Sequence, residues 1–336
     1  MTISELERIA CAPDPPLPRV DGLADAIADS VRYLGSDAAL RSIETDTYWP
    51  KWHSPWWHML LLWELGEAQR IPEGVVRAML DGLNALPLHI FPIHEHEWPP
   101  GLDRHRHSSC HCALGSMAQV LAACGVDVDR ALPWVKPWFD RYQLEDGGLN
   151  CDDSAYLVHD ECPSSMVGTI APFEAMVQLD PDGAFVERAA RFLVERRLSR
   201  GSQSVHNAEE RDREPAWRQI AFPRFYFYDV LRGASALVRW ASIARQPLPR
   251  AAISEVIAVL AANFPDGIVR VQRRAHAGIG TWHEAAPGRW ERVPQASTFP
   301  LLDVTSALDQ PSAAATRQWT ATRHALRALI ERGRIV

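Results

Sequence analysis

The stretch QLEDGGLNCDD (residues 143–153) joins an Asp-Gly-Gly turn to one thiol and two adjacent carboxylates. Glycine adopts a positive φ without steric cost, so Gly147 and Gly148 predict a sharp turn here. The reactive side chains of residues 151–153 therefore follow a turn rather than lie inside a regular element. Loops fixed on a rigid scaffold often carry catalytic groups, which makes this stretch a candidate site.

The apolar patterns elsewhere in the chain are helical, and no convincing run of alternating strands is present. Residues 54–66, for example, start with a serine and a proline and end in a glycine, which are helix start and stop signals. The helices expected from such patterns cover residues 54–66, 72–86, 108–125, 129–144, 164–179, 182–198, 226–241, 250–264 and 313–333.

These helices alternate in character along the chain. The segments that start near residues 54, 108, 164 and 226 are apolar all round, as buried helices are, whereas the segments between them have one polar face. The buried segments start 54 to 62 residues apart, a spacing typical of helical repeats. We therefore predict one all-α domain over residues 51–336, with an inner ring of helices wrapped by an outer ring. Residues 1–50 are expected to form a leader and a helix.

The QLEDGGL motif resembles the Gln-x-x-Asp-Gly-Gly-Trp repeat of squalene and oxidosqualene cyclases and of protein prenyltransferase β-subunits. The blocks SSMVGT (164–169) and FPRFYFYDVLRG (222–233) also look like parts of uncharacterised bacterial relatives of that superfamily, and FPDG (264–267) is a degraded copy of the motif. The resemblance covers residues 50–335, with Leu149 where the repeat has Trp. It implies an α/α toroid in which residues 105–112, 150–164, 224–229 and 297–303 converge on a central cavity.

The resemblance also implies acid catalysis at NCDDSA (150–155), which looks like the Asp-x-Asp-Asp-Thr-Ala motif of class II terpene cyclases. Adjacent carboxylates raise the pKa of one of them by like-charge repulsion, so that it stays protonated. Asp152 would be the proton donor and Asp153 its partner, although Asn150 stands where the family has Asp. The alternative interpretation is a solvated turn followed by a helix cap.

The sequence DEC (160–162) resembles two of the three zinc ligands of protein prenyltransferase β-subunits, which would be Asp160 and Cys162 here. The third family ligand is a histidine, and residues 226–229 contain none. Cys162 also precedes an inner helix, whose dipole would lower the pKa of the thiol. The alternative is a buried structural cysteine.

Six of the 13 histidines lie within residues 89–111, where Cys110 and Cys112 flank His111. Imidazole and thiolate are the usual ligands of Zn²⁺ and related transition metals. His105 and His107 would face one side of an extended loop. Cys110 and Cys112 cannot share a helical face if the helix has already begun, so not all of these residues can be ligands. A loop of surface histidines is the alternative.

The chain contains 13 Trp, 6 Tyr and 10 Phe. Aromatic faces stabilise cations, but aromatic side chains also fill the space between helical layers. Asp229 and Arg232 are three residues apart on a helix, so an ion pair between them explains both. The candidate substrate-binding residues are Trp57, Tyr156, Arg224, Tyr226, Tyr228 and Asp229.

Three functions remain open. The leading hypothesis is an enzyme without a cofactor that cyclises, isomerises or dehydrates an apolar, isoprenoid-like molecule. Its catalytic residues would be Asp152, Asp153, Cys151, Cys162 and His111. The first alternative is an enzyme that uses zinc or another transition metal on a more polar substrate. Its ligands would be drawn from His105, His107, His111, Cys112, Cys151, Asp160 and Cys162. The second alternative is a non-catalytic toroid that binds a ligand.

Charge and composition limit the partners. The net charge of −7 argues against nucleic acid, whose binding surfaces are basic. No apolar run approaches the roughly 20 residues of a membrane span, and the N-terminus lacks the apolar core of a signal peptide. We therefore expect a cytoplasmic protein with free thiols and a small-molecule substrate, and assembly into a homo-oligomer is left open. Only two of the 35 basic residues are lysines, Lys51 and Lys136.

Overall fold

The computed structural model describes residues 1–336 and is mostly helical, as predicted. It contains sixteen α-helices and one antiparallel hairpin of β1 (Thr281–Ala286) and β2 (Arg289–Val293). The expectation of a chain without strands is therefore wrong at this hairpin. Most of its side chains are exposed or half-buried, so the apolar alternation that identifies a buried strand is missing. The remaining signal is Gly288 in the turn, which has a φ of +74°.

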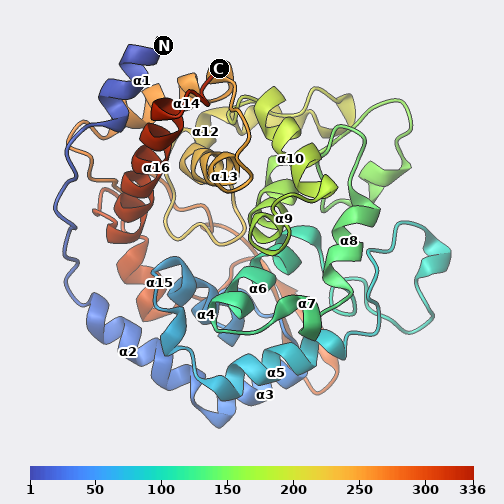
Figure 1. The fold of residues 1–336 in the computed structure, drawn as a ribbon. Helices are drawn as coiled ribbons and strands as arrows, with labels where there is room; N and C mark the ends of the chain where they lie inside the picture. The colour runs from blue at the N-terminus through green and yellow to red at the C-terminus, as the bar shows by residue number, and fades with distance from the viewer.

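Four helices form the apolar interior and follow one another in space. Each is buried along most of its length, and the first three are apolar on nearly all sides, whereas the last has polar residues on one side. Neighbours in the series pack against each other, and α6 and α9 make the most extensive contact (Figure 1). These helices are α4 (Pro55–Glu64), α6 (His111–Ala123), α9 (Met166–Leu179) and α13 (Val230–Ile243).

Amphipathic helices lie outside this series. Helix α5, for example, buries Val75, Val76, Met79 and Leu83 on one face. The single helix expected over residues 129–144 is wrong, because a break at Leu132 and Pro133 divides it into two helices. The outer helices are α5 (Glu73–Asn84), α7 (Val128–Ala131), α8 (Val135–Tyr142), α10 (Ala184–Glu195) and α14 (Arg250–Asn263).

The two ends of the chain pack onto the same body. Helix α16 lies against α13, and α1 lies against α16 and α14. Helix α2 contacts α4 and α15, while α3 contacts α5. Residues 1–50 thus hold three helices rather than a leader and one helix. These elements are α1 (Ile3–Ala10), α2 (Leu23–Leu34), α3 (Asp37–Thr45), α15 (Pro300–Thr305) and α16 (Ala313–Glu331).

Five helices line one partly open cavity. Helices α4, α6, α9, α13 and α16 line a space of about 420 Å³. Charged groups cross this interior, since Arg232 on α13 binds Glu174 on α9 at 2.6 Å. The short helices α11 (Glu209–Asp212) and α12 (Glu214–Trp217) complete the set. None of the helices combines the length and apolar character that a membrane span requires.

We expect buried histidines to make this fold sensitive to acid. The ring of His58 stacks on Phe299 with 3.8 Å between centroids, and burial lowers its pKa to about 3. In the unfolded chain the same group takes up a proton near its ordinary pKa of 6.5. The free energy of unfolding should therefore fall below pH 6.5 by up to about 1.4 kcal/mol per pH unit from this group. His58→Gln should flatten this dependence in urea denaturation at several pH values. If the free energy of unfolding of His58→Gln depends on pH as steeply as that of wild-type protein, His58 is not the source of the acid sensitivity.

Candidate metal and thiol site

The Asp-Gly-Gly turn is fixed to helix α9 by hydrogen bonds. Ser164 Oγ donates to the Asp146 carboxylate at 2.5 Å, and Leu149 N donates to Thr169 Oγ1 at 2.8 Å. Gly147 has a φ of +90°, and a Cβ there would lie 2.2 Å from the carbonyl oxygen of Arg188. Only glycine fits this turn, and the chain that leaves it runs to the N-terminus of α6.

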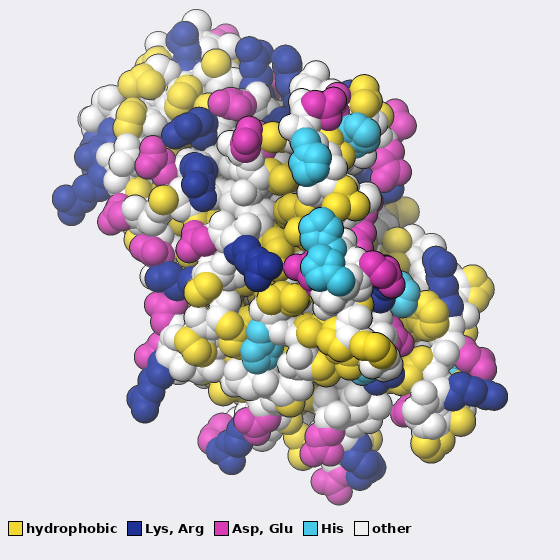
Figure 2. All heavy atoms as spheres, turned by 90° about the vertical axis from the view of Figure 1, so that its right-hand side faces the viewer, with side chains coloured by type: hydrophobic (Ala, Val, Ile, Leu, Met, Phe, Trp, Pro, Cys, Tyr) yellow, Lys and Arg dark blue, Asp and Glu magenta, His cyan; other side chains and the backbone are white.

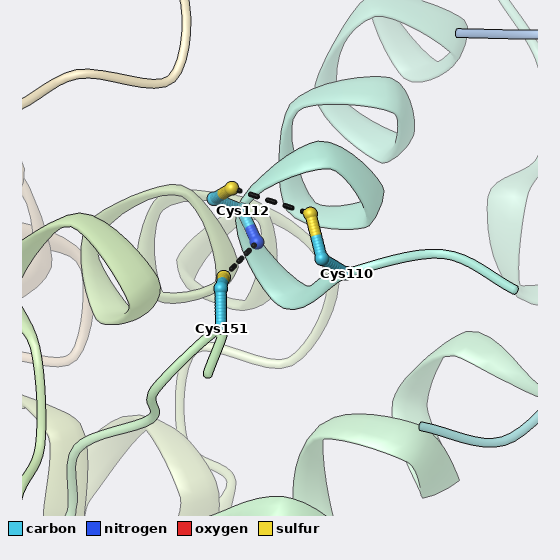
Figure 3. A group of neighbouring side chains, drawn as sticks. All are labelled: Cys110, Cys112 and Cys151. Atoms are coloured by element: carbon cyan, nitrogen blue, oxygen red, sulfur yellow. Dashed lines mark hydrogen bonds between the residues drawn. The ribbon is translucent and has the colours of Figure 1, made fainter. Parts of the chain in front are cut away.

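Three cysteine side chains meet where this segment reaches α6 (Figure 3). The sulfurs of Cys110 and Cys112 lie 3.5 Å apart, and the backbone N–H of Cys112 donates to Cys151 Sγ at 3.5 Å. All three sulfurs lie within 4.8 Å of one another. The condition under which Cys110 and Cys112 could not share a helical face is not met here. Helix α6 begins only at His111, and Cys110 is its N-cap with an extended backbone.

The spacing of these sulfurs suits a thiophilic metal ion. Zinc–sulfur bonds of about 2.3 Å place two sulfurs of a tetrahedral site about 3.8 Å apart, close to the arrangement here. Three cysteine ligands also leave a fourth position free for water or substrate, as in catalytic zinc sites. The adjoining cavity measures about 250 Å³. Its lining includes Tyr48, Lys51, Phe91, Arg106, Cys110 and Cys151.

The three thiols interact through hydrogen bonds, which shift their pKa values in opposite directions. Hydrogen bonds from Cys112 and Cys151, and one from the backbone N–H of Ala113, hold the pKa of Cys110 well below its ordinary value. The pKa values of Cys112 and Cys151 are raised, first by their hydrogen bonds to Cys110 and also by burial. One thiolate is thus stabilised in the protein alone, and metal binding would release the remaining protons.

His111 lies beside the cluster, but both of its ring nitrogens already have hydrogen-bond partners. Its Nδ1 accepts a hydrogen bond from Trp138 Nε1 at 2.8 Å, and its Nε2 lies 2.9 Å from the Tyr156 hydroxyl. Burial lowers the pKa of His111 to about 4. The Tyr156 hydroxyl also accepts from the backbone N–H of Asn150 at 3.1 Å. His111 and Tyr156 therefore position the loop that carries Cys151.

The two carboxylates that follow Cys151 have different surroundings from those expected of a buried acid. Asp152 is exposed, and its Oδ1 accepts from the N–H and hydroxyl of Ser154 at 3.0 and 2.8 Å. It caps the 3₁₀ turn Asp153–Leu157, as the cap interpretation anticipated. Asp153 is half-buried and lines a shallow cavity together with Asp152 and Cys151.

Of the candidate ligands, only Cys112 and Cys151 belong to the cysteine cluster. Asp160 is exposed and Cys162 half-buried, and neither is among the three grouped residues. His105 is exposed and stacks on Trp282 with 5.0 Å between ring centroids, while His107 Nδ1 accepts from the N–H of Asp103. Figure 2 shows histidines gathered on the face that carries the loop of residues 89–110.

Four of the proposed substrate-binding residues are engaged inside the protein. Trp57 is fully buried, and the Tyr228 hydroxyl donates to the carbonyl of Leu198 at 2.7 Å. Asp229 is buried as the N-cap of α13, and Arg224 binds Gln318 at 2.6 Å. The ion pair expected between Asp229 and Arg232 is not formed. The guanidinium of Arg232 instead binds Glu174, and Asp229 lies 3.9 Å from Arg224.

Tyr226, by contrast, lies next to the cluster together with a residue that sequence reasoning missed. Lys51 Nζ donates to the Tyr226 hydroxyl at 2.9 Å. The same nitrogen lies 4.9 to 5.4 Å from the ring centroids of Tyr48, Trp49, Trp52 and Tyr226. The available signal was that Lys51 is one of only two lysines in the chain.

Comparisons of the chain with protein-family models, with curated proteins and with solved structures give no match. The geometry and chemistry of the site are therefore the basis for its function.

Replacing Gly147 should destabilise the turn that places Cys151. In Gly147→Ala the new Cβ would meet Arg188 backbone atoms, and the positive φ adds strain. We expect a loss of at least about 2 kcal/mol in the free energy of unfolding, measured by urea denaturation. Gly101→Ala is the matched control, since Gly101 has a φ of +86° but open space around it. Equal losses in the two variants would show that the close contact does not matter.

Asp152 should act through its cap rather than through its charge. Asn preserves the acceptor oxygen, so Asp152→Asn should change the free energy of unfolding by less than about 0.5 kcal/mol. Asp152→Ala removes the acceptor and should cost about 1 kcal/mol. Both values come from urea denaturation at neutral pH. If Asn costs as much as Ala, the carboxylate charge itself is required.

Proposed function

We propose that the protein is an enzyme that depends on zinc or a comparable thiophilic metal ion, held by Cys110, Cys112 and Cys151. The single observation that carries this proposal is the approach of three sulfurs within 4.8 Å beside a cavity. The ligands come from two distant parts of the sequence, which lets the fold hold them in place before a metal arrives. Tetrahedral coordination by three thiolates leaves the fourth position for substrate or water.

A metal ion in this position would polarise a substrate oxygen or activate a bound water or thiol. The cavity suits a more polar substrate than an isoprenoid, because cationic side chains contribute to its wall. Arg106 is oriented by Asp46, with Nε 3.2 Å from the carboxylate, and Lys51 is oriented by Tyr226. Phe91 and Trp49 supply the apolar part of the same wall.

We also propose that the helices close into the α/α toroid suggested by the sequence. The support for this is the cavity that α4, α6, α9, α13 and α16 line together. The proposal further places the protein in a reducing cytoplasm, because thiolate ligands have to remain free of disulfides. Acid-catalysed chemistry on an isoprenoid-like substrate stays a prediction. The exposed, capping position of Asp152 favours the metal-dependent alternative over it.

Elemental analysis of purified, tag-free protein tests the metal proposal. We expect about one transition-metal ion per chain, as three thiolate ligands from one site predict. Cys112→Ser and Cys151→Ser should each lower the metal content strongly. Cys162→Ser is the matched control and should retain the metal, since Cys162 lies outside the cluster.

Cobalt substitution gives a second measurement that does not depend on activity. Thiolate-to-metal charge-transfer absorption should appear with wild-type protein and with Cys162→Ser, and should weaken in Cys151→Ser. A wild-type protein that binds neither zinc nor cobalt after refolding in their presence would refute the proposed function.

A further inference from the structure

Lys51 differs from the other lysine of the chain, because its ammonium group has no carboxylate partner. Its Nζ makes one hydrogen bond, to the Tyr226 hydroxyl at 2.9 Å. Lys136, the other lysine, lies 3.3 Å from the carboxylate of Asp180 and 3.9 Å from that of Asp129. Lys51 is therefore the lysine of the chain that is not held in an ion pair.

The side chain of Lys51 is half-buried among aromatic rings at the wall of the cavity. Four rings lie 4.9 to 5.4 Å from its nitrogen, and its backbone N–H is fixed to Thr281 Oγ1 at 2.6 Å. Burial lowers the pKa of Lys51, while the thiols of Cys112 and Cys110 act in the opposite direction. The aromatic faces also favour the cation. The amine therefore lies among aromatic rings, with one hydrogen bond and without an ion pair.

The choice of lysine at this position is informative. Every other basic residue except Lys136 is arginine. A guanidinium stacks on aromatic rings as well as an ammonium does, but it does not lose its proton in proteins. If the position required only a cation, arginine would serve. What lysine adds is a primary amine that can attack a carbonyl carbon.

We propose that Lys51 is a nucleophile that binds a carbonyl-bearing substrate as a Schiff base inside the cavity of the cysteine cluster. The neutral amine attacks the carbonyl carbon, and the carbonyl oxygen takes a proton to give a carbinolamine. Loss of that oxygen as water then leaves the carbon–nitrogen double bond. No oxidant or reductant is consumed. The Tyr226 hydroxyl, 2.9 Å from Nζ, is placed to relay the protons.

This inference adds a substrate class, an aldehyde or ketone, to the site of the proposed function. It rests on the proposed function only for what happens to the substrate after the Schiff base has formed. The amine chemistry itself does not need the metal. The cavity of about 250 Å³ limits the substrate to a small molecule. One end of such a molecule would reach Lys51 and the other the thiols, because Cys110 and Cys151 line the same space.

Reductive trapping provides the test. Full-length wild-type protein is incubated at neutral pH with benzaldehyde and sodium cyanoborohydride, and the modified peptides are quantified by mass spectrometry. Lys136 and the N-terminal amine serve as comparators inside the same molecule. We expect modification of Lys51 to be at least about tenfold faster than that of Lys136, because burial lowers the pKa of Lys51 and Lys136 is held by two carboxylates.

Matched variants sharpen the result. Lys51→Arg keeps the charge and should lose the adduct, whereas Lys136→Arg should keep the adduct at Lys51. Tyr226→Phe should slow the reaction at Lys51 and leave Lys136 unaffected. If Lys51→Arg does not fold, the ratio of the modification rates of Lys51 and Lys136 in wild-type protein still tests the proposal. Modification of Lys51 no faster than that of Lys136 would overturn the proposal.

The metal content of the same samples separates the two proposals. Rapid trapping at Lys51 in protein that binds no metal would refute the metal proposal and retain this one. A stoichiometric metal with no preferential trapping at Lys51 would retain the metal proposal and refute the Schiff-base proposal.

Discussion

The close contact between helices α6 and α9 is the constraint on which the site depends. Gly115 on α6 faces the backbone of Ala171 and Pro172, and a Cβ at this glycine would lie 2.4 Å from Pro172 N. Gly168 on α9 has the same role toward the loop, because a Cβ there would lie 2.7 Å from the carbonyl oxygen of Leu149. These two glycines let the N-terminus of α6 and the segment after the Asp-Gly-Gly turn approach each other. Without that approach, Cys151 would not reach Cys110 and Cys112.

The interior also contains charges, and their arrangement explains why several conspicuous residues are structural. Glu64, at the end of α4, accepts hydrogen bonds from the backbone of Arg224 and Phe225 at 2.9 and 2.6 Å. Arg232 donates to the carbonyls of Phe225 and Phe227 as well as to Glu174. A buried charge is costly unless it is paired and hydrogen-bonded, and this network meets that requirement. It holds the segment that presents Tyr226 to Lys51.

The helical elements were predictable because their signals are local. Largely apolar sequence identified α4, α6, α9 and α13 as interior helices, and the glycines of residues 147–148 identified the turn. The hairpin of β1 and β2 escaped prediction because most of its side chains are exposed or half-buried and leave no apolar alternation. The break between α7 and α8 was missed because an amphipathic pattern continues across Pro133. The local signal was absent at the hairpin, and at Pro133 it was outweighed by the amphipathic pattern.

The sequence by itself determined that the chain is mostly helical, where the sharp turn lies, and that thiols and histidines are concentrated near residues 89–112 and 151–162. Only the tertiary structure decided which of these residues act together. It selected Cys110, Cys112 and Cys151, left Cys162 and His105 outside, and brought Lys51 to the same cavity. The physical reason is that a site needs several groups within a few ångströms. Helix packing brings together residues 39 positions apart, as the hydrogen bond from Cys112 to Cys151 shows, and no local pattern encodes that distance.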